Sequence, residues 1–234
     1  MAEREKTYWW HLGRLKIIES YINKLAKESN LRILNVGCGT GGTIKMLQKY
    51  GQVDNVDISD DAIKFMKKEG FNNIYKVDGI KLPFKDKQYD LVVAFDVLEH
   101  IDEHGAAMAE WKRVLKDDGA ILITVPAYQW LWTQHDVSLH HKRRYTSSSL
   151  KKIAKSVGLK PKKVSYAITF SLPLVVGFRY LNKLLHKKTT EETSYVNVPD
   201  WLNRAFTKIL YGEASLHRVT SLPIGTSVIG AFRK

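Results

Sequence analysis

The chain of 234 residues has almost no cysteine. Its single cysteine, Cys38, excludes a disulfide within the chain and suits a reducing compartment. The uncharged stretch Val164–Phe178 is too short to cross a bilayer as a helix, and Pro173 interrupts it. The first ten residues, MAEREKTYWW, carry charges of both signs and do not resemble a signal peptide. We therefore expect a cytoplasmic protein with one domain over residues 1–234.

Acidic residues are missing from one long segment, Val137–Thr190. The basic residues elsewhere balance the acidic ones, so the net charge of +13 arises in this segment. A solvated surface usually mixes both signs, which favours an anionic partner over a solubility role. The basic residues are Lys142, Arg143, Arg144, Lys151, Lys152, Lys155, Lys160, Lys162, Lys163, Arg179, Lys183, Lys187 and Lys188.

Three anionic partners are compatible with this charge: a phosphorylated or lipid-linked small molecule, an acidic membrane surface, and nucleic acid. Nucleic acid is the least favoured, because only Tyr145 stands among the basic residues of 142–163 as a stacking aromatic. Val164–Phe178 is followed by Arg179 and Tyr180, which fits peripheral contact with an acidic membrane, at the inner membrane face. Equally, its first half can be a strand and the rest a packed helix.

Residues 31–42 read LRILNVGCGTGG, an apolar run that breaks into glycines. Glycines let the backbone turn sharply and approach a ligand, and the next helix aims its free N–H groups at that ligand. Asp57 ends the second apolar run, where a carboxylate can accept both hydroxyls of a ribose. The pattern predicts an adenosine-bearing cofactor, although Gly37, Gly39 and Gly42 also satisfy the G-x-G-x-x-G pattern of dinucleotide enzymes.

Short apolar runs alternate with helical patterns along the first two thirds of the chain, which indicates a mostly parallel sheet covered on both faces. An amphipathic helix is expected first, over 12–29. The turn Lys116–Gly119 is expected to lead into the fifth strand. The expected strands are 31–36, 53–57, 73–77, 90–95, 120–125, 161–168 and 224–232, and the expected helices that separate the earlier ones are 42–49, 60–68, 103–116 and 147–157.

Two further motifs carry a resemblance to a known family. Asp78-Gly79 precedes Leu82-Pro83-Phe84, and Leu98-Glu99-His100 follows the fourth strand. Together with the glycines and Asp57, they resemble the class I S-adenosylmethionine-dependent methyltransferases, in the broad branch of methyltransferase types 11 and 12. The resemblance implies a Rossmann-like α/β fold, with a doubly wound, mostly parallel seven-stranded sheet and an antiparallel last strand. It also implies S-adenosyl-L-methionine as cofactor and S-adenosyl-L-homocysteine as product.

The same resemblance implies roles for the residues that follow the strands. Asp57 would hold the ribose, Ile58 would pack on the adenine, and Asp78 and Gly79 would bind its edge. Asn35 stands where the family usually has an acid, so hydrogen bonding replaces a charge there. As an alternative, each aspartate could simply cap a helix. Phe95 and Asp96 would lie beside the methionine end of the cofactor. The implied cofactor-binding residues are Asn35, Gly37, Cys38, Gly39, Gly41, Asp57, Ile58, Asp78, Gly79, Phe95 and Asp96.

Two segments lie outside the implied core fold. Residues 1–30 would form an N-terminal lid helix. Residues 169–222 would form a helical insertion between the last two strands, long enough to be functional. We expect it to be a cap that faces the substrate or a membrane.

The loop Ala127–Tyr145 is expected to carry the chemistry. Methyl transfer to a hydroxyl needs alignment and removal of a proton, which histidine can accept near neutral pH. The segment HKRRY, residues 141–145, and the pattern of Trp9, Trp10 and Arg14 resemble a bacterial and archaeal branch often found with surface-polysaccharide or lipid-linked sugar genes. This likeness predicts a catalytic group of His141, His135, Asp136 and Tyr145, and a substrate-binding group of Arg143, Arg144 and Trp132.

Within the catalytic group, His141 is the predicted base, and Asp136 or His135 would orient it. Arg143 and Arg144 would bind an anion, because guanidinium groups suit bidentate phosphate contacts. The alternative is that Arg144 and Tyr145 only anchor the next helix and that the histidines lie on the surface.

A metal site is the weaker alternative; we expect none as the first interpretation. Asp96, Glu99 and His100 match the acid-x-x-Glu-His pattern of small-RNA 2′-O-methyltransferases and ubiquinone-pathway O-methyltransferases. His135 or His141 could complete a site for Mg²⁺, Mn²⁺ or Fe²⁺.

The favoured function is methyl transfer, by histidine-assisted O-methylation, to a small or lipid-linked anionic acceptor. Two alternatives stay open: an RNA or protein methyltransferase, and a non-catalytic cofactor-binding interaction protein. A nicotinamide oxidoreductase is less favoured, because it leaves Asp78-Gly79 and the late antiparallel strand unexplained.

Overall fold

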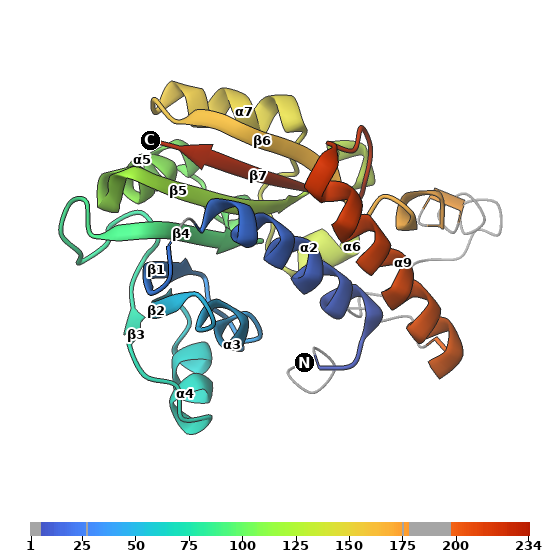
Figure 1. The fold of residues 1–234 in the computed structure, drawn as a ribbon, viewed down its shortest axis with the longest axis horizontal. Helices are drawn as coiled ribbons and strands as arrows, with labels where there is room; N and C mark the ends of the chain where they lie inside the picture. Colours follow the sequence, from blue (N-terminus) through green and yellow to red (C-terminus); the bar gives the residue numbers. More distant parts are fainter. Residues whose placement is uncertain (1–5, 27, 175, 178–197) are drawn as a thin grey trace.

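The computed structural model describes residues 6–26, 28–174, 176–177 and 198–234 (Figure 1). Its seven strands form one sheet in the order β3-β2-β1-β4-β5-β7-β6. The strands are β1 (Leu31–Val36), β2 (Gly51–Asp57), β3 (Ile74–Lys76), β4 (Tyr89–Phe95), β5 (Leu115–Pro126), β6 (Lys160–Ala167) and β7 (Ser227–Arg233). The helices are α2 (Trp9–Leu25), α3 (Ile44–Leu47), α4 (Asp60–Lys68), η1 (Leu98–His100), α5 (His104–Val114), η2 (Gln129–Leu131), α6 (Gln134–Ser138), α7 (Ser147–Ser156) and α9 (Asp200–Val219).

The predicted fold class is confirmed. The first five strands pair in parallel, and β7 runs antiparallel to both β5 and β6. Strands β2 and β3 extend the sheet from one edge of β1. The chain then returns, and β4 pairs with the opposite edge of β1, so the order of strands reverses there. Ligands of open α/β sheets bind at such a switch point, beyond the carboxyl ends of the strands. The glycines that follow β1 lie at this edge.

Two elements differ from the expected ones. The expected turn Lys116–Gly119 lies within β5, where the pairing shifts register between Tyr89↔Leu115 and Leu91↔Ala120. The extra residues therefore bulge out of the ladder instead of ending it. Helix α2 ends at Leu25, earlier than expected, because Ala26 already has an extended backbone.

Helices cover both faces of the sheet (Figure 1). On one face, buried Ile18 and Ile22 of α2 and Leu210 of α9 pack against strands β1, β4 and β5. On the other face, buried Trp111 of α5 and Leu150 of α7 belong to the second core cluster. Because both faces are covered, the central strands read as near-continuous apolar runs.

Helices α2 and α9 lie side by side and are fastened at both ends. The backbone N–H of Trp9 donates to Asn203 Oδ1 over 2.8 Å. At the other end, the Tyr21 hydroxyl and His217 Nδ1 lie 3.2 Å apart. Buried Glu213 accepts the backbone N–H groups of Ile168 and Thr169 over 2.6 and 2.9 Å. Helix α2 is thus part of the core over most of its length.

The chain between β6 and β7 includes α9. Residues 175 and 178–197 of the expected insertion lie outside the described residues, and its role as a cap stays a prediction. Across the part of the chain that the structure describes, no helix combines the length and hydropathy needed to span a membrane.

The contact between α2 and α9 leaves no room for a side chain at Gly13. A Cβ added there would stand 2.1 Å from Leu210 Cδ1, whereas one added at Gly212 of α9 would meet nothing within 4 Å. We predict that Gly13→Ala lowers the free energy of unfolding by about 1–3 kcal/mol through overpacking. Gly212→Ala should raise it by roughly 0.5–1 kcal/mol, because alanine loses less backbone entropy in a helix. Urea unfolding of both variants measures the difference, and equal effects would contradict this packing.

Candidate functional site

The glycine loop after β1 adopts a conformation that larger residues avoid. Gly37, Gly39 and Gly41 have φ angles of +68°, +52° and +80°. A Cβ at Gly37 would also stand 2.3 Å from Val97 Cγ2. The loop is tied to β2 because the Gly39 N–H donates to Asp57 Oδ2 over 2.8 Å. The predicted ribose-binding carboxylate therefore stands directly beside the predicted glycine loop.

The second oxygen of Asp57 holds the start of the next helix. The Ser59 N–H donates to Asp57 Oδ1 over 2.9 Å, and the Ser59 side chain caps α4. Between these residues, the side chain of Ile58 is 68% exposed. An apolar side chain held in water at this position is what packing against an adenine ring would require, and this contact stays a prediction.

Asn35 and Cys38 are among the predicted cofactor residues that are buried. Asn35 Nδ2 donates to Asn55 Oδ1 over 3.0 Å, so this amide joins β1 to β2. One N–H of the Asn35 amide is thus engaged within the sheet, and a contact of Asn35 with the cofactor stays a prediction. The Cys38 side chain is also buried, and burial, followed by the charge of Asp57, raises its pKa to about 12. The thiol therefore stays protonated and packs as a small apolar group.

The loop after β3 brings the predicted adenine-edge residues to the same end of the sheet. Asp78 Oδ1 accepts the Ile80 N–H over 3.0 Å. The Gly79 carbonyl accepts from Trp111 Nε1 over 2.9 Å. A Cβ at Gly79 would stand 3.3 Å from Val36 Cγ1, so the loop after β3 packs closely against the end of β1.

Asp96 follows β4 and is neutralised by the N-terminal helix. Its Oδ2 lies 2.7 Å from Nη2 of Arg14, and its Oδ1 accepts from the Thr124 hydroxyl over 3.0 Å. The Arg14 guanidinium also lies over the rings of Trp10 and Phe95, at 5.2 and 5.9 Å. The Trp-Trp-x-x-x-Arg pattern thus has a physical role that the sequence did not reveal: it places a cation at the predicted methionine end of the site. Thr124 was missed because a threonine in a strand gives no signal of its own.

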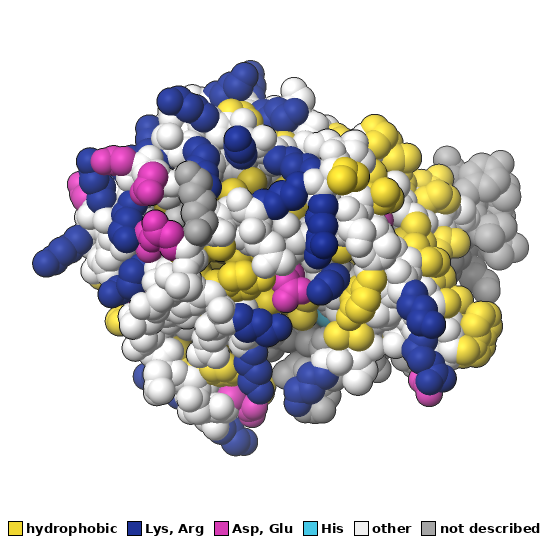
Figure 2. Space-filling view, in the orientation of Figure 1, with side chains coloured by type: hydrophobic (Ala, Val, Ile, Leu, Met, Phe, Trp, Pro, Cys, Tyr) yellow, Lys and Arg dark blue, Asp and Glu magenta, His cyan; other side chains and the backbone are white. Residues whose placement is uncertain are grey.

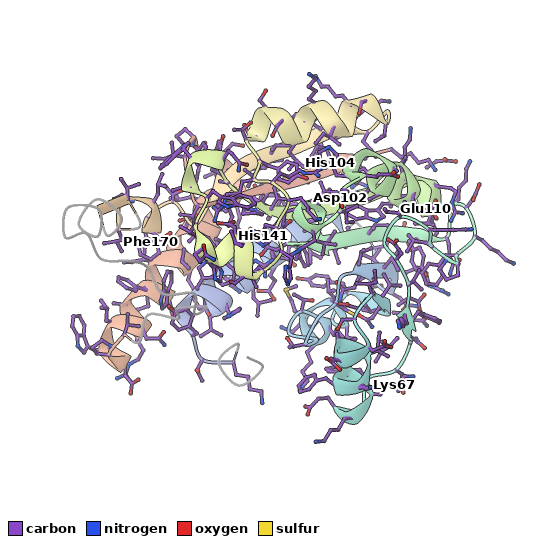
Figure 3. The ribbon with its side chains drawn as sticks, turned by 180° about the vertical axis from the view of Figure 1, so that it is seen from behind. Lys67, Asp102, His104, Glu110, His141 and Phe170 are labelled. Carbon is purple, nitrogen blue, oxygen red and sulfur yellow. The ribbon has the colours of Figure 1, made fainter. Side chains whose placement is uncertain are left out.

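The loop after β5 centres on the buried carboxylate of Asp136. His141 Nδ1 lies 2.8 Å from its Oδ1, and Arg144 donates to both of its oxygens over 2.7 and 2.9 Å. The Thr133 N–H and hydroxyl also donate to Oδ2. Burial would raise the pKa of Asp136, but the hydrogen bonds from His141 and Arg144 outweigh it and hold that pKa well below its ordinary value. Figure 3 labels His141, which lies on the loop after β5, shortly after α6.

Two predicted roles need correction, because the side chains are engaged inside the protein. Arg144 pairs with Asp136 and donates to the Ala127 carbonyl, so its guanidinium orders the loop instead of facing an anion. The Tyr145 hydroxyl is buried between the Leu98 carbonyl and His104, at 3.2 and 2.9 Å, and burial raises its pKa. Tyr145 is therefore an anchor and not a proton acceptor.

The other predicted residues are more open. Arg143 donates to the Asp102 carbonyl over 3.0 Å and is partly exposed. Trp132, half-buried, follows η2, and His135 lies exposed on α6. Of the two residues predicted to orient His141, Asp136 is the one whose contact with its ring the structure shows.

Glu99 is the anomaly of the site. Its side chain is fully buried in η1, and neither carboxylate oxygen has a hydrogen-bond partner among the residues that the structure describes. Burial, followed by the charge of Asp96, raises its pKa well above the ordinary value. A buried carboxyl group without a partner is costly, unless it is protonated or faces a cation.

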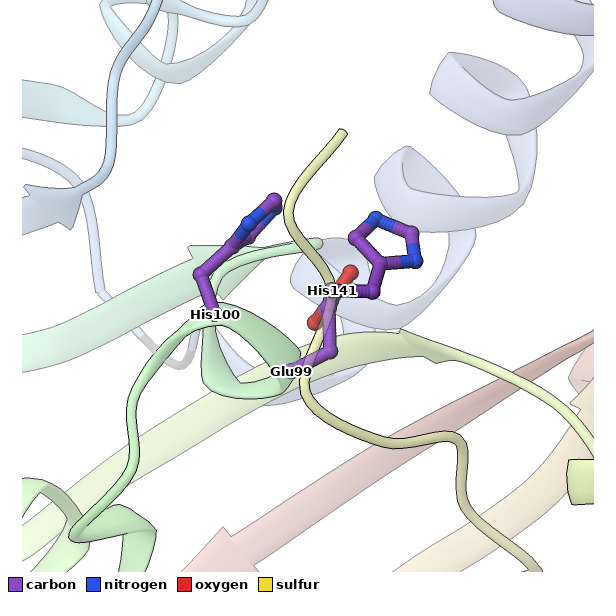
Figure 4. Close-up of side chains that lie close together, drawn as sticks. All are labelled: Glu99, His100 and His141. Carbon is purple, nitrogen blue, oxygen red and sulfur yellow. The ribbon is translucent and has the colours of Figure 1, made fainter. Parts of the chain in front are cut away.

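Two histidines stand next to Glu99 (Figure 4). One ligand atom each from Glu99, His100 and His141 lies within 4.8 Å of the others. The His100 and His141 rings meet edge to face at 4.8 Å, and burial, followed by His141, lowers the pKa of His100. One carboxylate and two imidazoles are a donor set that divalent transition metals accept. Asp96, which the sequence grouped with Glu99 and His100, pairs instead with Arg14.

Residues 34–123 match a family model described as a methyltransferase domain. An uncharacterised methyltransferase of Schizosaccharomyces pombe is 35% identical over 117 residues, which cover 44% of this chain and 42% of the relative. A ubiquinone biosynthesis O-methyltransferase of Saccharophagus degradans is 26% identical over 137 residues, which cover 52% of this chain and 58% of the relative. A crystal structure of an S-adenosylmethionine-dependent methyltransferase from Archaeoglobus fulgidus has a TM-score of 0.61 at 20% identity, covering 100% of this chain and 98% of that one.

The fold is thus the Rossmann-like methyltransferase fold, and residues 34–123 match a methyltransferase domain. Both findings agree with the resemblance to the class I S-adenosylmethionine-dependent methyltransferases that the motifs carry, and the Archaeoglobus fulgidus structure is described as dependent on S-adenosylmethionine. The chain spans 42%, 43% and 38% of the length of three of the curated relatives it matches.

The unpartnered carboxyl of Glu99 makes a testable contribution to stability. Its pKa is raised in the folded protein above the value of about 4.3 for unfolded glutamate. The free energy of unfolding is therefore not reduced by Glu99 below about pH 4.3. It falls as the pH rises from there toward the pKa of Glu99 in the folded protein. Glu99→Gln removes the ionisation. We therefore predict that the melting temperature of this variant, relative to that of the wild type, increases between about pH 5 and pH 8.

The matched control for this measurement is Glu103→Gln, because Glu103 is the same residue type in the same loop and is exposed. Its melting temperature should follow the wild type across the pH range. Parallel curves for Glu99→Gln and the wild type would show that the Glu99 carboxyl has a partner in solution.

Proposed function

We propose that this protein transfers the methyl group of S-adenosyl-L-methionine to an oxygen of a small or lipid-linked anionic acceptor, with His141 as the base. The contact between His141 Nδ1 and the buried Asp136 carboxylate carries the proposal. A carboxylate at Nδ1 favours the tautomer in which Nδ1 bears the proton, and Nε2 is then the nitrogen that can accept one.

The position of the loop supports this role. The Lys142 N–H donates to the Glu99 carbonyl over 2.8 Å, and Ala127 pairs with Tyr145 in an isolated bridge. The loop is thereby fastened to the carboxyl ends of β4 and β5, the edge at which a ligand of this fold binds. His141 lies within this loop, directly before the attachment at Lys142. Proton transfer to a positioned base contributes typically 10²–10⁴-fold to a reaction of this kind.

The surroundings of His141 favour an anionic acceptor. Exposed Lys142 and partly exposed Arg143 follow it directly in the chain, and their nearest contacts with the exposed Asp102 carboxylate are 3.3 and 3.8 Å. An arginine in this position can contact a phosphate or carboxylate group of the acceptor. With Arg144 committed to Asp136, Arg143 is the guanidinium that remains for the anion.

A second candidate is metal-assisted methyl transfer, favoured by the unpartnered Glu99 beside His100 and His141. A divalent ion bound there would lower the pKa of an acceptor hydroxyl. Histidine ligands commonly donate a hydrogen bond from the N–H of their other ring nitrogen to a carboxylate, and the contact of His141 with Asp136 fits that arrangement.

If a metal ion binds at Glu99, Mn²⁺ would raise the melting temperature of the wild type at pH 8 but not that of Glu99→Gln, and a chelator would abolish transfer.

We predict that the protein binds S-adenosyl-L-homocysteine through Asp57. The Asp57→Ala variant loses the acceptor for the ribose hydroxyls and for the Gly39 N–H. Hydrogen bonds to charged groups are worth about 1.5–3 kcal/mol, which corresponds to roughly a 10- to 100-fold loss of affinity. Calorimetry measures the loss, with exposed Asp61→Ala of α4 as the control. Binding of NAD in place of S-adenosyl-L-homocysteine would overturn the assignment.

We predict that His141→Gln lowers methyl transfer by about 10²–10⁴-fold while it leaves S-adenosyl-L-homocysteine binding intact. Methyl-tritiated S-adenosyl-L-methionine is incubated with protein and with separate lipid, small-metabolite, RNA and protein fractions of a cell extract. Label should enter the lipid or small-metabolite fraction. His135→Gln serves as the comparison, because His135 is exposed and does not orient the base.

Two outcomes would contradict the proposal. Label in the RNA or protein fraction would establish one of the macromolecular alternatives. Transfer that survives His141→Gln but not His135→Gln would assign the base to the other histidine.

A further inference from the structure

Helix α9 presents an apolar face to solvent. Its large side chains Trp201, Ile209, Leu216 and Val219 are 67%, 46%, 50% and 83% exposed. The opposite face, which includes buried Leu210, packs against the sheet and α2. Single exposed apolar residues are ordinary, whereas several on one helix mark an interaction surface. We call these four residues the α9 apolar face.

Cations accompany this face. Between Trp201 and Val219, the exposed residues include Arg204, Lys208 and Arg218, and none of them is acidic. Long basic side chains can lay their methylene stems along apolar surface and keep the charge at the polar boundary. A helix with large apolar side chains flanked by Lys and Arg is suited to lie in a membrane interface.

The cationic surface continues beyond the end of α9. An open hollow of about 600 Å³ lies at the edge strand β6, between the end of α9 and α7. Its lining combines Val219, Thr220 and Ser221 with four lysines, Lys151, Lys155, Lys162 and Lys163. Figure 2 shows Lys and Arg gathered over α7 and β6, and hydrophobic side chains over α9, on one face of the molecule.

We propose that the α9 apolar face and the lysine-lined hollow dock this protein on an acidic phospholipid surface. The apolar side chains enter the interface, and lipid phosphates neutralise the hollow and the cations of α9. A second copy of the chain is a poor occupant, because a two-fold interface would set these cations against each other in a protein of net charge +13. The exposed aliphatic residues equally disfavour a nucleic acid.

This docking surface is connected to the candidate site through α2. Asn203, in the first turn of α9, accepts from the backbone of Trp9. Arg14, on the same helix as Trp9, reaches Asp96 at the predicted methionine end of the cofactor site. The inference rests on the proposed function in one respect: docking at this face suits an acceptor that resides in the membrane.

The test is co-sedimentation with vesicles of phosphatidylcholine alone and of phosphatidylcholine with about 30% phosphatidylglycerol. The full chain should bind the anionic vesicles, and salt should weaken the binding. Trp201→Ser combined with Val219→Ser should lower the affinity about tenfold or more, because it removes the most exposed apolar groups. Arg204→Gln combined with Lys208→Gln should lower it several-fold.

The matched control is Lys67→Gln combined with Lys68→Gln, which removes the same charge from exposed positions of α4. Lys67 lies well away from α9 (Figure 3). A second readout is an environment-sensitive nitrobenzoxadiazole label on Leu216→Cys, with buried Cys38 protected from the reagent. Its emission should shift to the blue on anionic vesicles, and the same label on Lys68→Cys should not shift.

Three results would overturn the docking surface. The serine double variant could bind like the wild type, or the α4 control could lose as much affinity as Arg204→Gln with Lys208→Gln. The protein could instead form a dimer in sedimentation that the serine variant abolishes, without binding vesicles. Because co-sedimentation needs neither cofactor nor turnover, its failure is separate from a failure of S-adenosyl-L-homocysteine binding or methyl transfer.

Discussion

A carboxylate buried away from water needs a charged or hydrogen-bonding partner, and this requirement organises the carboxyl edge of the sheet. Asp136 satisfies it with Arg144, His141 and Thr133, and the three contacts together set the path of the loop after β5. Asp96 is partly exposed and pairs with Arg14, and this contact joins the N-terminal helix to the end of β4. In this second case, a segment distant in sequence is held at the site by an acid.

Glu99 is the exception, and the exception is informative. The residues around it are ordered and packed, yet its carboxylate oxygens have no partner. Three residues at the same edge, Asp96, Tyr128 and His140, have positive φ angles of 55°, 55° and 56°, which are uncommon for residues other than glycine. Such conformations persist where the surrounding structure over-determines them, commonly at functional sites. Both observations indicate that this edge is shaped for a ligand and not for stability alone.

The strands and the glycine loop could be predicted from the sequence, because their signals are local. Apolar runs of the right length define β1 and β4, and Gly37 with Asp57 marks the loop without knowledge of its surroundings. The contact between His141 and Asp136 was also predictable, since both residues lie in one short segment. The pairing of Arg14 with Asp96 was not, because it depends on how α2 crosses the sheet. Arg144 and Tyr145 were misread, because a basic or phenolic side chain looks available until its internal partner is known.

The exposed face of α9 is a second feature that could not be predicted from the sequence alone. Its apolar residues fit an ordinary amphipathic pattern, and only the packing of Leu210 against Gly13 shows which face is turned away from the protein. Once the helix is placed, its two faces have different consequences. The inner face fastens α2, which carries Arg14 to Asp96, whereas the outer face is left in water. A force or a surface that moves α9 must therefore act on α2, because the Asn203 contact with Trp9 and the pair of Tyr21 with His217 couple the two helices. Binding outside the site can in this way bias the position of Arg14, and hence the charge that a methionine carboxylate or an acceptor would meet there.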